Sequence, residues 1–403
     1  MNNEQLIKNI NLSINKFIDW FEAFGETSYD RMDYWSSRTG ILAKKIFYFN
    51  KIVGIPLAAW GLLLENFLPK VQKIYSKKHR EVIGDAHFAL SYFNLYEVTK
   101  EKRFLNKAEH FLSIMEKTST KGYSGMAWGY TFGWQQSKGK FWKSGIPMIT
   151  ITPYAFWAFK KHFEITNCNH SKEVCLSIAD FALNDLKKTV MSNGTTSYSY
   201  SPISKDVIIN ANTYRAAMLL DAYKISNNEG YRISAEESIE FVLSYQGQDG
   251  EWPYEVSDKN DSFIDNFHTC FVLRNLYKCY LVNKDQKLLN AIVKGYEYYY
   301  KNLFHDNGRP KHFSKIKYAK MRKYEMYDYA EGITLGILLK NHVSKSLEKS
   351  IFLANDLIDN FQTDKGYFIT RITSLNTKHK VPYLRWPQAQ LLFSLTNLYK
   401  DLK

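Results

Sequence analysis

The chain has 403 residues, of which 45% are hydrophobic and 23% charged, and its formal net charge at pH 7 is +14. With few prolines and no low-complexity tract, this composition excludes a disordered chain and is typical of a folded globular protein. The N-terminus lacks the basic start, apolar run and cleavage site of a secretory signal, so we expect a cytoplasmic protein that forms one domain over residues 1–403.

The first predicted element is an amphipathic helix from about Glu4 to Phe24, which has no partner helix beside it in the sequence. The following segment, residues 41–80, is basic and apolar. It contains an apolar run from Ile52 to Leu68, which is short of the roughly 20 apolar residues of a membrane span. Against Glu65 alone, it carries eight cations: Lys44, Lys45, Lys51, Lys70, Lys73, Lys77, Lys78 and Arg80.

Two interpretations of residues 41–80 stay open. The segment lies on an anionic membrane surface, with Trp60 and the lysines at the level of the lipid headgroups. Alternatively, it packs as a buried helix beside a solvated basic surface. Nucleic-acid binding is disfavoured, because the cations are interleaved with apolar residues.

Turns of the type Asn/Asp/Lys-Gly recur in the second half of the chain. Their glycines, Gly194, Gly250, Gly308 and Gly366, are 56, 58 and 58 residues apart. A helix-like segment precedes each turn, and an aromatic cluster and a second helix follow it. This period is longer than that of common open helical solenoids, and so favours helical hairpins arranged in a ring.

Six of the second helices open with a polar residue, which we expect to accept hydrogen bonds from first-turn amides. The helices that follow are apolar on most of their circumference, as expected for an inner layer, and their amphipathic partners should form an outer layer. The openings are Asp85-Ala-His87, Thr152-Pro-Tyr154, Asn210-Ala-Asn212, Asp265-Asn-Phe-His268, Asp328-Tyr-Ala-Glu331 and Arg385-Trp-Pro-Gln388.

The last inner helix, from Pro387 to Leu402, ends the chain without a following partner. Pairing it with the helix from Glu4 to Phe24 completes a sixth hairpin. The sequence therefore predicts an all-α protein, an (α/α)6-type toroid closed by its N-terminal and C-terminal helices. In such a ring, all inner-helix N-termini lie on one face.

We expect the four cysteines, Cys168, Cys175, Cys270 and Cys279, to be reduced and packed, because neither pair has CxxC spacing. The sequence also lacks an HExxH motif, a DxD cluster, a Walker loop and a GxGxxG motif. It therefore predicts no metal and no cofactor.

Aromatic pairs fall in the polar turn regions of the predicted face, at Trp128-Gly-Tyr130, Tyr198-Ser-Tyr200, Trp252-Pro-Tyr254, His312-Phe313 and Tyr367-Phe368. We expect them to line a cleft and to stack on sugar rings or bases, although they could instead plug the ring. The candidate substrate-binding residues on this face are His87, Trp128, Tyr130, Tyr200, Asn212, Tyr214, Trp252, Tyr254, Asn266, His312, Arg385, Trp386 and Gln388.

Two reaction types are open for the predicted cleft, and the candidate catalytic residues are Glu255, Asp265, His268, Asp328 and Glu331. Glu255 with Asp265 or Asp328 could divide the acid and base work of a glycosidase. Alternatively, His268 or Tyr254 abstracts the proton beside a uronic acid's carboxylate while Arg385 and Asn212 neutralise the enolate, as in a lyase or epimerase. In simpler interpretations, the aspartates are helix caps and His268 is a core group.

The segment Gln246–Trp252 (QGQDGEW) resembles the Q-x-x-x-G-x-W turn of squalene- and oxidosqualene-type cyclases, which are built from α/α rings. It occurs once, and no DxDD-like run accompanies it. The resemblance implies a shared ring geometry. The missing DxDD-like run argues against cyclase chemistry.

A broader resemblance is to α/α-toroid proteins encoded in bacterial capsule, O-antigen and exopolysaccharide gene clusters. It is carried by the basic apolar segment, by QDGxWPYE at 248–255, by DNFHT at 265–269, where Cys270 replaces the usual glycine, and by RWPQAQ at 385–390. The resemblance implies a role in producing surface polysaccharide. Toroidal lyases, glucuronyl C5-epimerases, unsaturated-uronyl hydrolases and N-acylglucosamine epimerases share the fold.

We therefore predict a carbohydrate-active protein that binds and modifies a glycan or a lipid-linked oligosaccharide, as a hydrolase, lyase or epimerase. Glu255, His268 and Arg385 are the first candidates for its acid/base, proton-transfer and anion-binding groups. The alternative is a non-catalytic glycan-binding or assembly factor with the same aromatic face.

Overall fold

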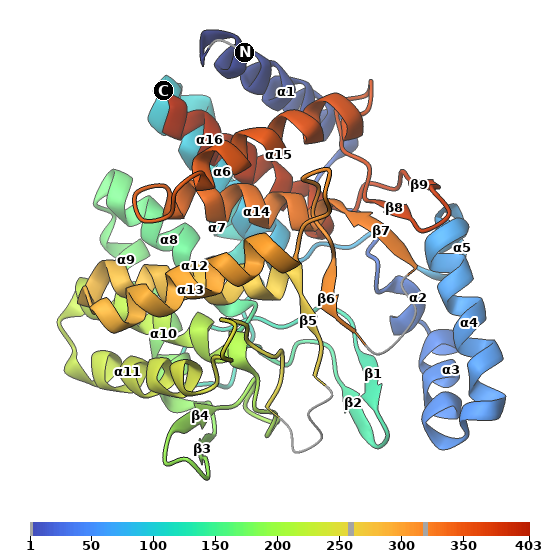
Figure 1. Cartoon of the computed structure of the whole chain (residues 1–403), viewed down its shortest axis with the longest axis horizontal. Coiled ribbons are helices and arrows are strands. Elements are labelled where there is room, and N and C mark those ends of the chain that lie inside the picture. Colours follow the sequence, from blue (N-terminus) through green and yellow to red (C-terminus); the bar gives the residue numbers. More distant parts are fainter. Residues whose placement is uncertain (1–2, 257–261, 317–320) are drawn as a thin grey trace.

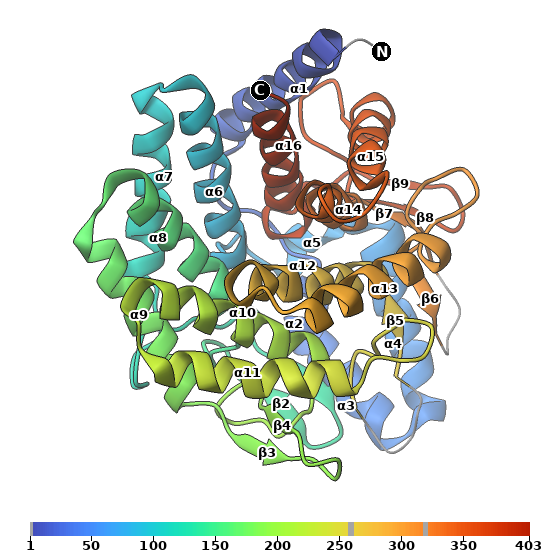
Figure 2. The same cartoon turned by 60° about the vertical axis from the view of Figure 1, so that its left-hand side comes forward.

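The computed structural model describes residues 3–256, 262–316 and 321–403. Twelve long helices in the described part of the chain form two concentric layers (Figures 1 and 2). In the inner layer each helix contacts the next and the last contacts the first, so that the ring closes as predicted. These helices are α6 (Val82–Thr99), α8 (Thr152–Thr166), α10 (Ile209–Ser226), α12 (Asn266–Asn283), α14 (Met326–Leu339) and α16 (Ala389–Leu402).

Each outer helix packs mainly on one inner helix, and α1 packs on α16, which confirms the predicted pairing of the two ends of the chain. Stacked rings of α1 seal this junction: Phe21 lies 4.2 Å from Phe88 of α6, and Phe17 lies 6.0 Å from Phe368. The outer helices are α1 (Asn3–Phe24), α7 (Lys102–Lys117), α9 (Asn169–Asn184), α11 (Glu229–Ser244), α13 (Gln286–Asn302) and α15 (Ser346–Phe361).

The apolar patterns explain which helix lies in which layer. In α10 nearly every residue from Ile209 to Leu220 is buried, because the helix has neighbours on both sides and an outer helix behind it. In α13 the buried residues recur at three- and four-residue spacing, from Leu288 through Ile292 to Tyr299, so that one stripe faces the ring. The predicted division into inner and outer helices is confirmed.

The glycine turns join each outer helix to the next unit. Gly194, Gly250, Gly308 and Gly366 all have positive φ, between +79° and +101°, which L side chains rarely adopt. At Gly366 a Cβ would also lie 2.1 Å from the carbonyl oxygen of Lys16 on α1. The turn thus packs directly on the helix that closes the ring.

A glutamine four residues before the glycine clips two of these turns to the next outer helix. Gln246 Nε2 donates to the carbonyl oxygens of Gly250 (3.1 Å) and of Ala291 on α13 (2.9 Å). Gln362 does the same with Gly366 (2.8 Å) and with Ser13 on α1 (3.0 Å). The Q-x-x-x-G-x-aromatic pattern therefore occurs twice and serves ring packing.

The predicted helix openings are correctly placed, but the capping expected of their polar residues is wrong except at Asp265. Asp265 accepts a hydrogen bond from the backbone N of His268 (3.1 Å). Thr152 instead accepts from the backbone N of Trp128, and Asn212 from that of Tyr198. These side chains hold the preceding loop, because that loop lies against the helix start.

Short antiparallel strands occupy the loops at the end of the ring where the inner helices begin, and they build the rim of the site. They pair as β1 (Trp134–Ser137) with β2 (Lys140–Trp142), β3 (Lys188–Val190) with β4 (Thr196–Tyr198), β5 (Ile264–Asp265) with β6 (Phe313–Lys315), and β7 (Arg322–Glu325) with β8 (Arg371–Thr373), which pairs with β9 (Lys378–His379).

Residues 33–75 form an arm beside this rim (Figure 1). The arm consists of α2 (Asp33–Ser36), α3 (Arg38–Phe49), α4 (Lys51–Phe67), a 3₁₀ turn (Pro69–Val71) and α5 (Gln72–Tyr75). Among the described residues, no single helix is long and apolar enough to cross a membrane, and α4 passes that test only together with residues 69–75, which bend by 99° from it.

The arm is tied to the ring by buried polar contacts on the inner side of α4. Arg371 of β8 donates to Glu65 and to Asn66, at 3.0 Å each, and Trp35 Nε1 also donates to Glu65 (3.0 Å). The interpretation of residues 41–80 as a buried helix is wrong, because large apolar side chains such as Ile52 and Trp60 are exposed on the arm.

Candidate functional site

A cavity of about 320 Å³ opens at the end of the ring where the inner helices begin. Its wall is mainly aromatic, with three basic side chains. The lining residues are Arg31, Met32, Ile83, Tyr130, Phe132, Trp134, Thr150, Tyr154, Tyr200, Asn210, Tyr214, Phe267, His268, Phe271, Tyr327, Arg385 and Trp386. The ring thus gathers Tyr130, Tyr200, Tyr214, His268, Arg385 and Trp386 of the predicted set in one place.

The aromatic pairs of the turn regions divide between core and cavity. Trp128 and Trp252 are buried, and each indole Nε1 donates at 2.9 Å to the last turn of the preceding outer helix. Tyr130 and Tyr200 line the cavity instead. Tyr254 lies beside it, with its ring 4.6 Å from that of His268. In these three pairs the second aromatic residue lies at or beside the cavity, whereas Phe368 of the last pair is buried against Phe17.

His268 is the titratable group best placed for proton transfer at this cavity. It lies in the first turn of α12, and its Nδ1–H donates to Oδ2 of the buried Asp265 (2.8 Å). The same carboxylate accepts the backbone N–H of His268, so that the ring orientation is fixed. With Nδ1 engaged, Nε2 is the nitrogen available to a ligand in the cavity.

Arg385 is held by a buried ion pair. Its Nε and Nη2 donate to the two carboxylate oxygens of Asp30, at 2.6 and 2.5 Å. Burial alone would raise the pKa of Asp30, but the charge and hydrogen bonds of Arg385 outweigh it, and the net shift is downward. Arg385 therefore lines the cavity in a fixed orientation, and its charge is neutralised by Asp30.

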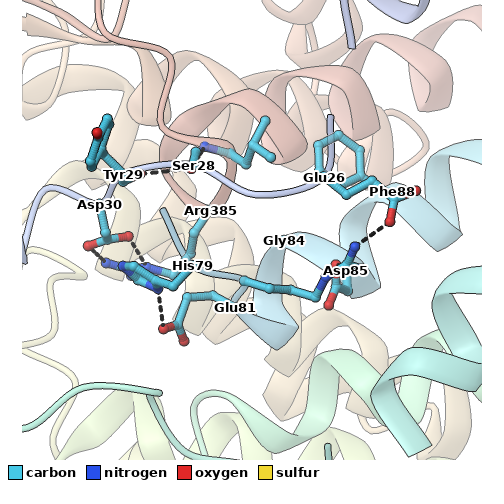
Figure 3. A pocket seen from close by; sticks show the side chains of 12 residues that line it. Glu26, Ser28, Tyr29, Asp30, His79, Glu81, Gly84, Asp85, Phe88 and Arg385 are labelled. Atoms are coloured by element: carbon cyan, nitrogen blue, oxygen red, sulfur yellow. Dashed lines mark hydrogen bonds and ion pairs between the residues drawn. The ribbon is translucent and has the colours of Figure 1, made fainter. Parts of the chain in front are cut away.

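A second polar network backs this pair, in the small recess of Figure 3. His79 contacts both Asp33 (3.2 Å) and Glu81 (3.1 Å). These hydrogen bonds outweigh the effect of burial and raise the pKa of His79 to about 10. Arg80 bridges Glu26 and Asp85, and burial raises the pKa of Asp85 to about 7. The recess is filled by its own side chains and serves to position Arg385.

Arg31 also lines the cavity and was not among the residues predicted from the sequence. Its guanidinium lies 4.9 Å from the centre of the Trp386 ring, and among the described residues it has no hydrogen-bond or ion-pair partner. Burial is the first cause that lowers its pKa, while Glu325 and Glu65 act against that shift from a distance. The residue lies outside the repeat, so no periodic pattern marks it.

Glu331 lies in the centre of the ring, where it accepts a hydrogen bond from Arg274 Nη1 (2.6 Å). Arg274 Nη2 donates to the hydroxyls of Tyr154 and Tyr214, at 3.1 and 3.0 Å. Burial is the main cause that raises the pKa of Glu331. Tyr154 and Tyr214 form the floor of the cavity, and Glu331 is paired with Arg274 below that floor.

Beyond this floor, a second cavity of about 590 Å³ opens at the opposite end of the ring. Tyr154 lines both cavities, whereas His87 lines only the second one, and its Nδ1 contacts the carbonyl oxygen of Ile83 (2.7 Å). His87 therefore lies apart from the predicted residues that line the first cavity.

Three candidate binding residues form hydrogen bonds with the backbone of neighbouring loops. Asn212 Oδ1 accepts from the N–H of Tyr198 (2.8 Å), and Gln388 Oε1 accepts from that of Phe368 (3.0 Å). Asn266 Nδ2 donates to the carbonyl oxygen of Leu303 (3.0 Å). All three are buried. Their amide groups are used in the fold, so they do not line the cavity.

The remaining carboxylate candidates do not line the cavity either. Asp328 is fully buried and accepts from His312 Nδ1 (2.7 Å), whose Nε2 accepts from Arg322 (3.0 Å). Burial is the first cause that raises the pKa of Asp328. The backbone of Glu255 bridges to that of Ile208 at the rim. Within the described ranges, no Asp or Glu lines the cavity.

The four cysteines are free, and three of them are buried, as expected. In the part of the chain that the structure describes, no group of three or more His, Cys, Asp or Glu side chains is arranged to hold a metal ion.

No protein-family model matches the sequence, and no curated protein sequence matches it. Solved structures do match the fold. A cellobiose 2-epimerase from Bacillus thermoamylovorans aligns with a TM-score of 0.61 and 12% identity, over 80% of this chain and 89% of its own. A GH76 α-mannanase from Bacteroides thetaiotaomicron aligns with a TM-score of 0.61 and 12% identity, over 81% and 87%.

An α-1,6-mannanase from Salegentibacter, solved as an inactive variant in complex with mannotriose, aligns with a TM-score of 0.59 and 12% identity, over 79% of this chain and 89% of its own. In that variant two consecutive aspartates are replaced by asparagine. At such identities the likeness concerns the fold alone. The chain thus has the α/α-toroid fold that these epimerases and mannanases also have.

Proposed function

We propose that the chain is a carbohydrate-active enzyme that moves a proton at a sugar carbon, as an epimerase, isomerase or lyase does. The observation that carries this proposal is the pair of His268 with Asp265 at the wall of an aromatic cavity. Aromatic rings offer flat apolar faces to a sugar, and a histidine held by a carboxylate is suited to acid–base work near neutral pH.

The charges around His268 suggest the chemical step. His268 Nε2 takes the proton from the carbon next to a carbonyl or carboxylate, and Asp265 stabilises the imidazolium that forms. Arg31 lies in the same cavity and can balance the negative charge of the enolate oxygens. Return of a proton from solvent water on the other face gives the epimer, whereas departure of the neighbouring glycosidic oxygen, which takes the proton from the imidazolium, gives a lyase product.

The unpaired guanidinium of Arg31 supports an acidic sugar as the substrate. Arg31 is half-buried, so its unpaired charge is partly desolvated, and a substrate carboxylate would supply two acceptor oxygens. Arg385 is already paired with Asp30, so it is suited to fix the cavity wall. A uronic acid within a glycan is the substrate that we infer from this contrast.

Hydrolysis is less well supported than proton transfer. Glycosidases of the usual type need two carboxyl groups that flank the scissile bond. In the described part of the chain no carboxylate lines the cavity. In the inactive mannanase variant, two consecutive aspartates are replaced. The present sequence contains no two adjacent aspartates, so it offers no equivalent pair.

The setting that we propose is the cytoplasmic production of a bacterial surface polysaccharide, with a glycan or a lipid-linked oligosaccharide as the substrate. The resemblance of the segments at 248–255, 265–269 and 385–390 supports it. The alternative, a glycan-binding or assembly factor, would use the same aromatic wall but would not need the His268–Asp265 pair.

Single substitutions test the proposal. Purified protein is incubated with glucuronate-containing oligosaccharides, and products are separated by anion-exchange chromatography. We expect His268→Asn to abolish turnover, and Asp265→Asn to reduce it about 100-fold, while both still bind the oligosaccharide. Glu255→Gln, outside the cavity wall, should retain turnover. Loss of activity in Glu255→Gln alone would support a hydrolase instead, and unchanged turnover in His268→Asn would refute the proposal.

A further inference from the structure

The arm, residues 33–75, presents an unusual apolar surface. Eleven of the twenty exposed large hydrophobic side chains in the described part of the chain lie on it, so the exposure is concentrated rather than scattered. They are Leu42, Phe49, Ile52, Val53, Ile55, Leu57, Trp60, Leu62, Leu63, Leu68 and Ile74. Ile52 and Phe49 are 85% and 84% exposed, close to their exposure in an unfolded chain. Soluble surfaces rarely carry so large a patch unless something covers it.

The exposed charges on and next to the arm all have one sign. Six lysines between residues 45 and 78 are exposed: Lys45, Lys51, Lys70, Lys73, Lys77 and Lys78. The two acids between residues 31 and 80, Asp33 and Glu65, are both buried. Glu65 is neutralised by Arg371, and Asp33 contacts His79. Exposed apolar side chains with lysines around them, and no exposed acid, match an anionic lipid surface.

The arm is also rigidly placed. Gly61 of α4 packs so closely on Tyr34 of α2 that an added Cβ would lie 2.1 Å from its ring. Tyr383 Oη donates to Gln72 of α5 (3.0 Å), and Tyr48 Oη donates to the backbone of Gln136 in β1. The apolar side chains therefore project from a fixed framework, and burying them elsewhere in this chain would require these contacts to break.

This framework is continuous with the wall of the cavity. Arg31 and Met32 line the cavity and directly precede α2. Strand β1, which contacts α2 and α3, supplies Trp134 to the same wall. Figure 1 shows the arm beside the strands of the rim. A surface that binds the arm would therefore lie next to the cavity that Arg31, Met32 and Trp134 line.

We propose that the arm lies on the surface of an anionic membrane, with its apolar side chains at the boundary of headgroups and acyl chains and its lysines against lipid phosphates. The membrane contact stands independently of the catalytic assignment. A second element rests on the proposed function: the cavity receives its sugar from a lipid carrier in the same surface, so that the substrate is a lipid-linked oligosaccharide.

The test is co-sedimentation of the full chain with vesicles of phosphatidylcholine alone, and of phosphatidylcholine with 30% phosphatidylglycerol. We expect binding to the anionic vesicles that weakens with salt, and much weaker binding to the neutral ones. Ile52→Ser with Trp60→Ser should reduce the partition coefficient about 10- to 100-fold. Replacing Lys45, Lys51, Lys70 and Lys73 by Gln should reduce it more than about tenfold.

Val190→Ser with Ile233→Ser is the matched control, because these side chains are 69% and 54% exposed but lie on β3 and α11, away from the arm. The control and His268→Asn should bind vesicles like the unmodified chain, so a failure of the catalytic assignment leaves this result intact. Vesicle binding by the arm variant equal to that of the control would overturn the proposal. So would a stable oligomer that the arm variant converts to monomer, since a second copy would then cover the patch.

The lipid-linked element has its own readout. A glucuronate-containing oligosaccharide on a polyprenyl diphosphate in anionic vesicles is compared with the same oligosaccharide free in solution. We expect Ile52→Ser with Trp60→Ser to lower turnover of the lipid-linked form at least about tenfold and to leave turnover of the free form unchanged. An equal effect on both forms would refute delivery from the membrane.

Discussion

Arg31 and Arg385 illustrate how two residues of the same type in one cavity can have different tasks. Arg385 is neutralised by Asp30 and braced by the network around His79, whereas Arg31 meets only the face of Trp386. The sequence pointed to Arg385 through its place in a repeated helix opening. It contained no such sign for Arg31, because that residue lies between the first helix and the arm. A residue that belongs to the repeat could be predicted as a cavity residue, whereas one outside the repeat could not.

Replacing Arg31 by Gln tests the anion-binding role. Charged hydrogen bonds to a carboxylate are worth about 1.5–3 kcal/mol, so we expect affinity for a glucuronate-containing oligosaccharide to fall about 10- to 100-fold in calorimetric titration. Binding of the matching neutral glucose oligosaccharide should change less than about threefold. Stability should change little, because no hydrogen bond is lost within the described residues. Equal losses for both sugars would contradict this role.

For the helices and loops, sequence patterns predicted where the elements begin but not what their polar side chains contact. The starts of the inner helices were placed correctly from their polar openings, yet of these residues only Asp265 caps its helix. Thr152, Asn212 and Gln388 hold loops, a task that depends on which backbone lies within reach after folding. The aromatic pairs divide between core and cavity for the same reason. A sequence shows that such side chains need partners, but the ring packing decides which partners they find.

The attachment of the arm should depend on pH through Glu65. Burial alone would raise its pKa, but Arg371 outweighs that effect and lowers it to about 2, below the ordinary value of 4.5. Because the folded pKa is the lower one, the stabilisation is complete above about pH 4.5 and is lost as the pH falls toward 2. We expect Glu65→Gln to lower the free energy of unfolding at pH 7 by about 3 kcal/mol and to flatten its decline below pH 4.5.

Urea unfolding followed by circular dichroism at pH 7, 4 and 3 measures this effect. The exposed Glu297 on α13 provides the control, and Glu297→Gln should follow the unmodified chain at every pH. An unchanged stability of Glu65→Gln at pH 7, with the same acid decline, would show that the ion pair with Arg371 does not hold the arm.

At the scale of the whole molecule, the ring was predictable because one physical requirement repeats. Each hairpin must turn tightly and pack on the next. The tight turns have positive φ, so glycines occur in them at a regular spacing. The N-terminal helix had no partner in the sequence, and α16 had none either, so closure was the arrangement that satisfied both. The arm lies outside the repeat. Its composition alone did not show whether its apolar side chains are exposed or buried.

Ring closure can be tested at Gly366. Both Gly366 and Gly194 have positive φ, but a Cβ at Gly366 would lie 2.1 Å from the carbonyl oxygen of Lys16, whereas Gly194 faces open space. We expect Gly194→Ala to cost about 1–2 kcal/mol from backbone strain, and Gly366→Ala to cost more, because α1 must move. Urea unfolding gives both values. Equal losses would show that the turn does not hold α1 in place.

If His268 moves a proton at a sugar carbon, the hydrogen at that carbon is lost to the solvent, and incubation in heavy water measures this loss. A glucuronate-containing oligosaccharide is incubated with the protein in D₂O and followed by NMR. We expect deuterium to enter at the carbon beside the carboxylate of an epimerised product, or that carbon to lose its hydrogen in an unsaturated lyase product, and His268→Asn to prevent either change while binding persists. Deuterium entry that is the same with His268→Asn, or bond cleavage by hydrolysis without any exchange, would contradict it.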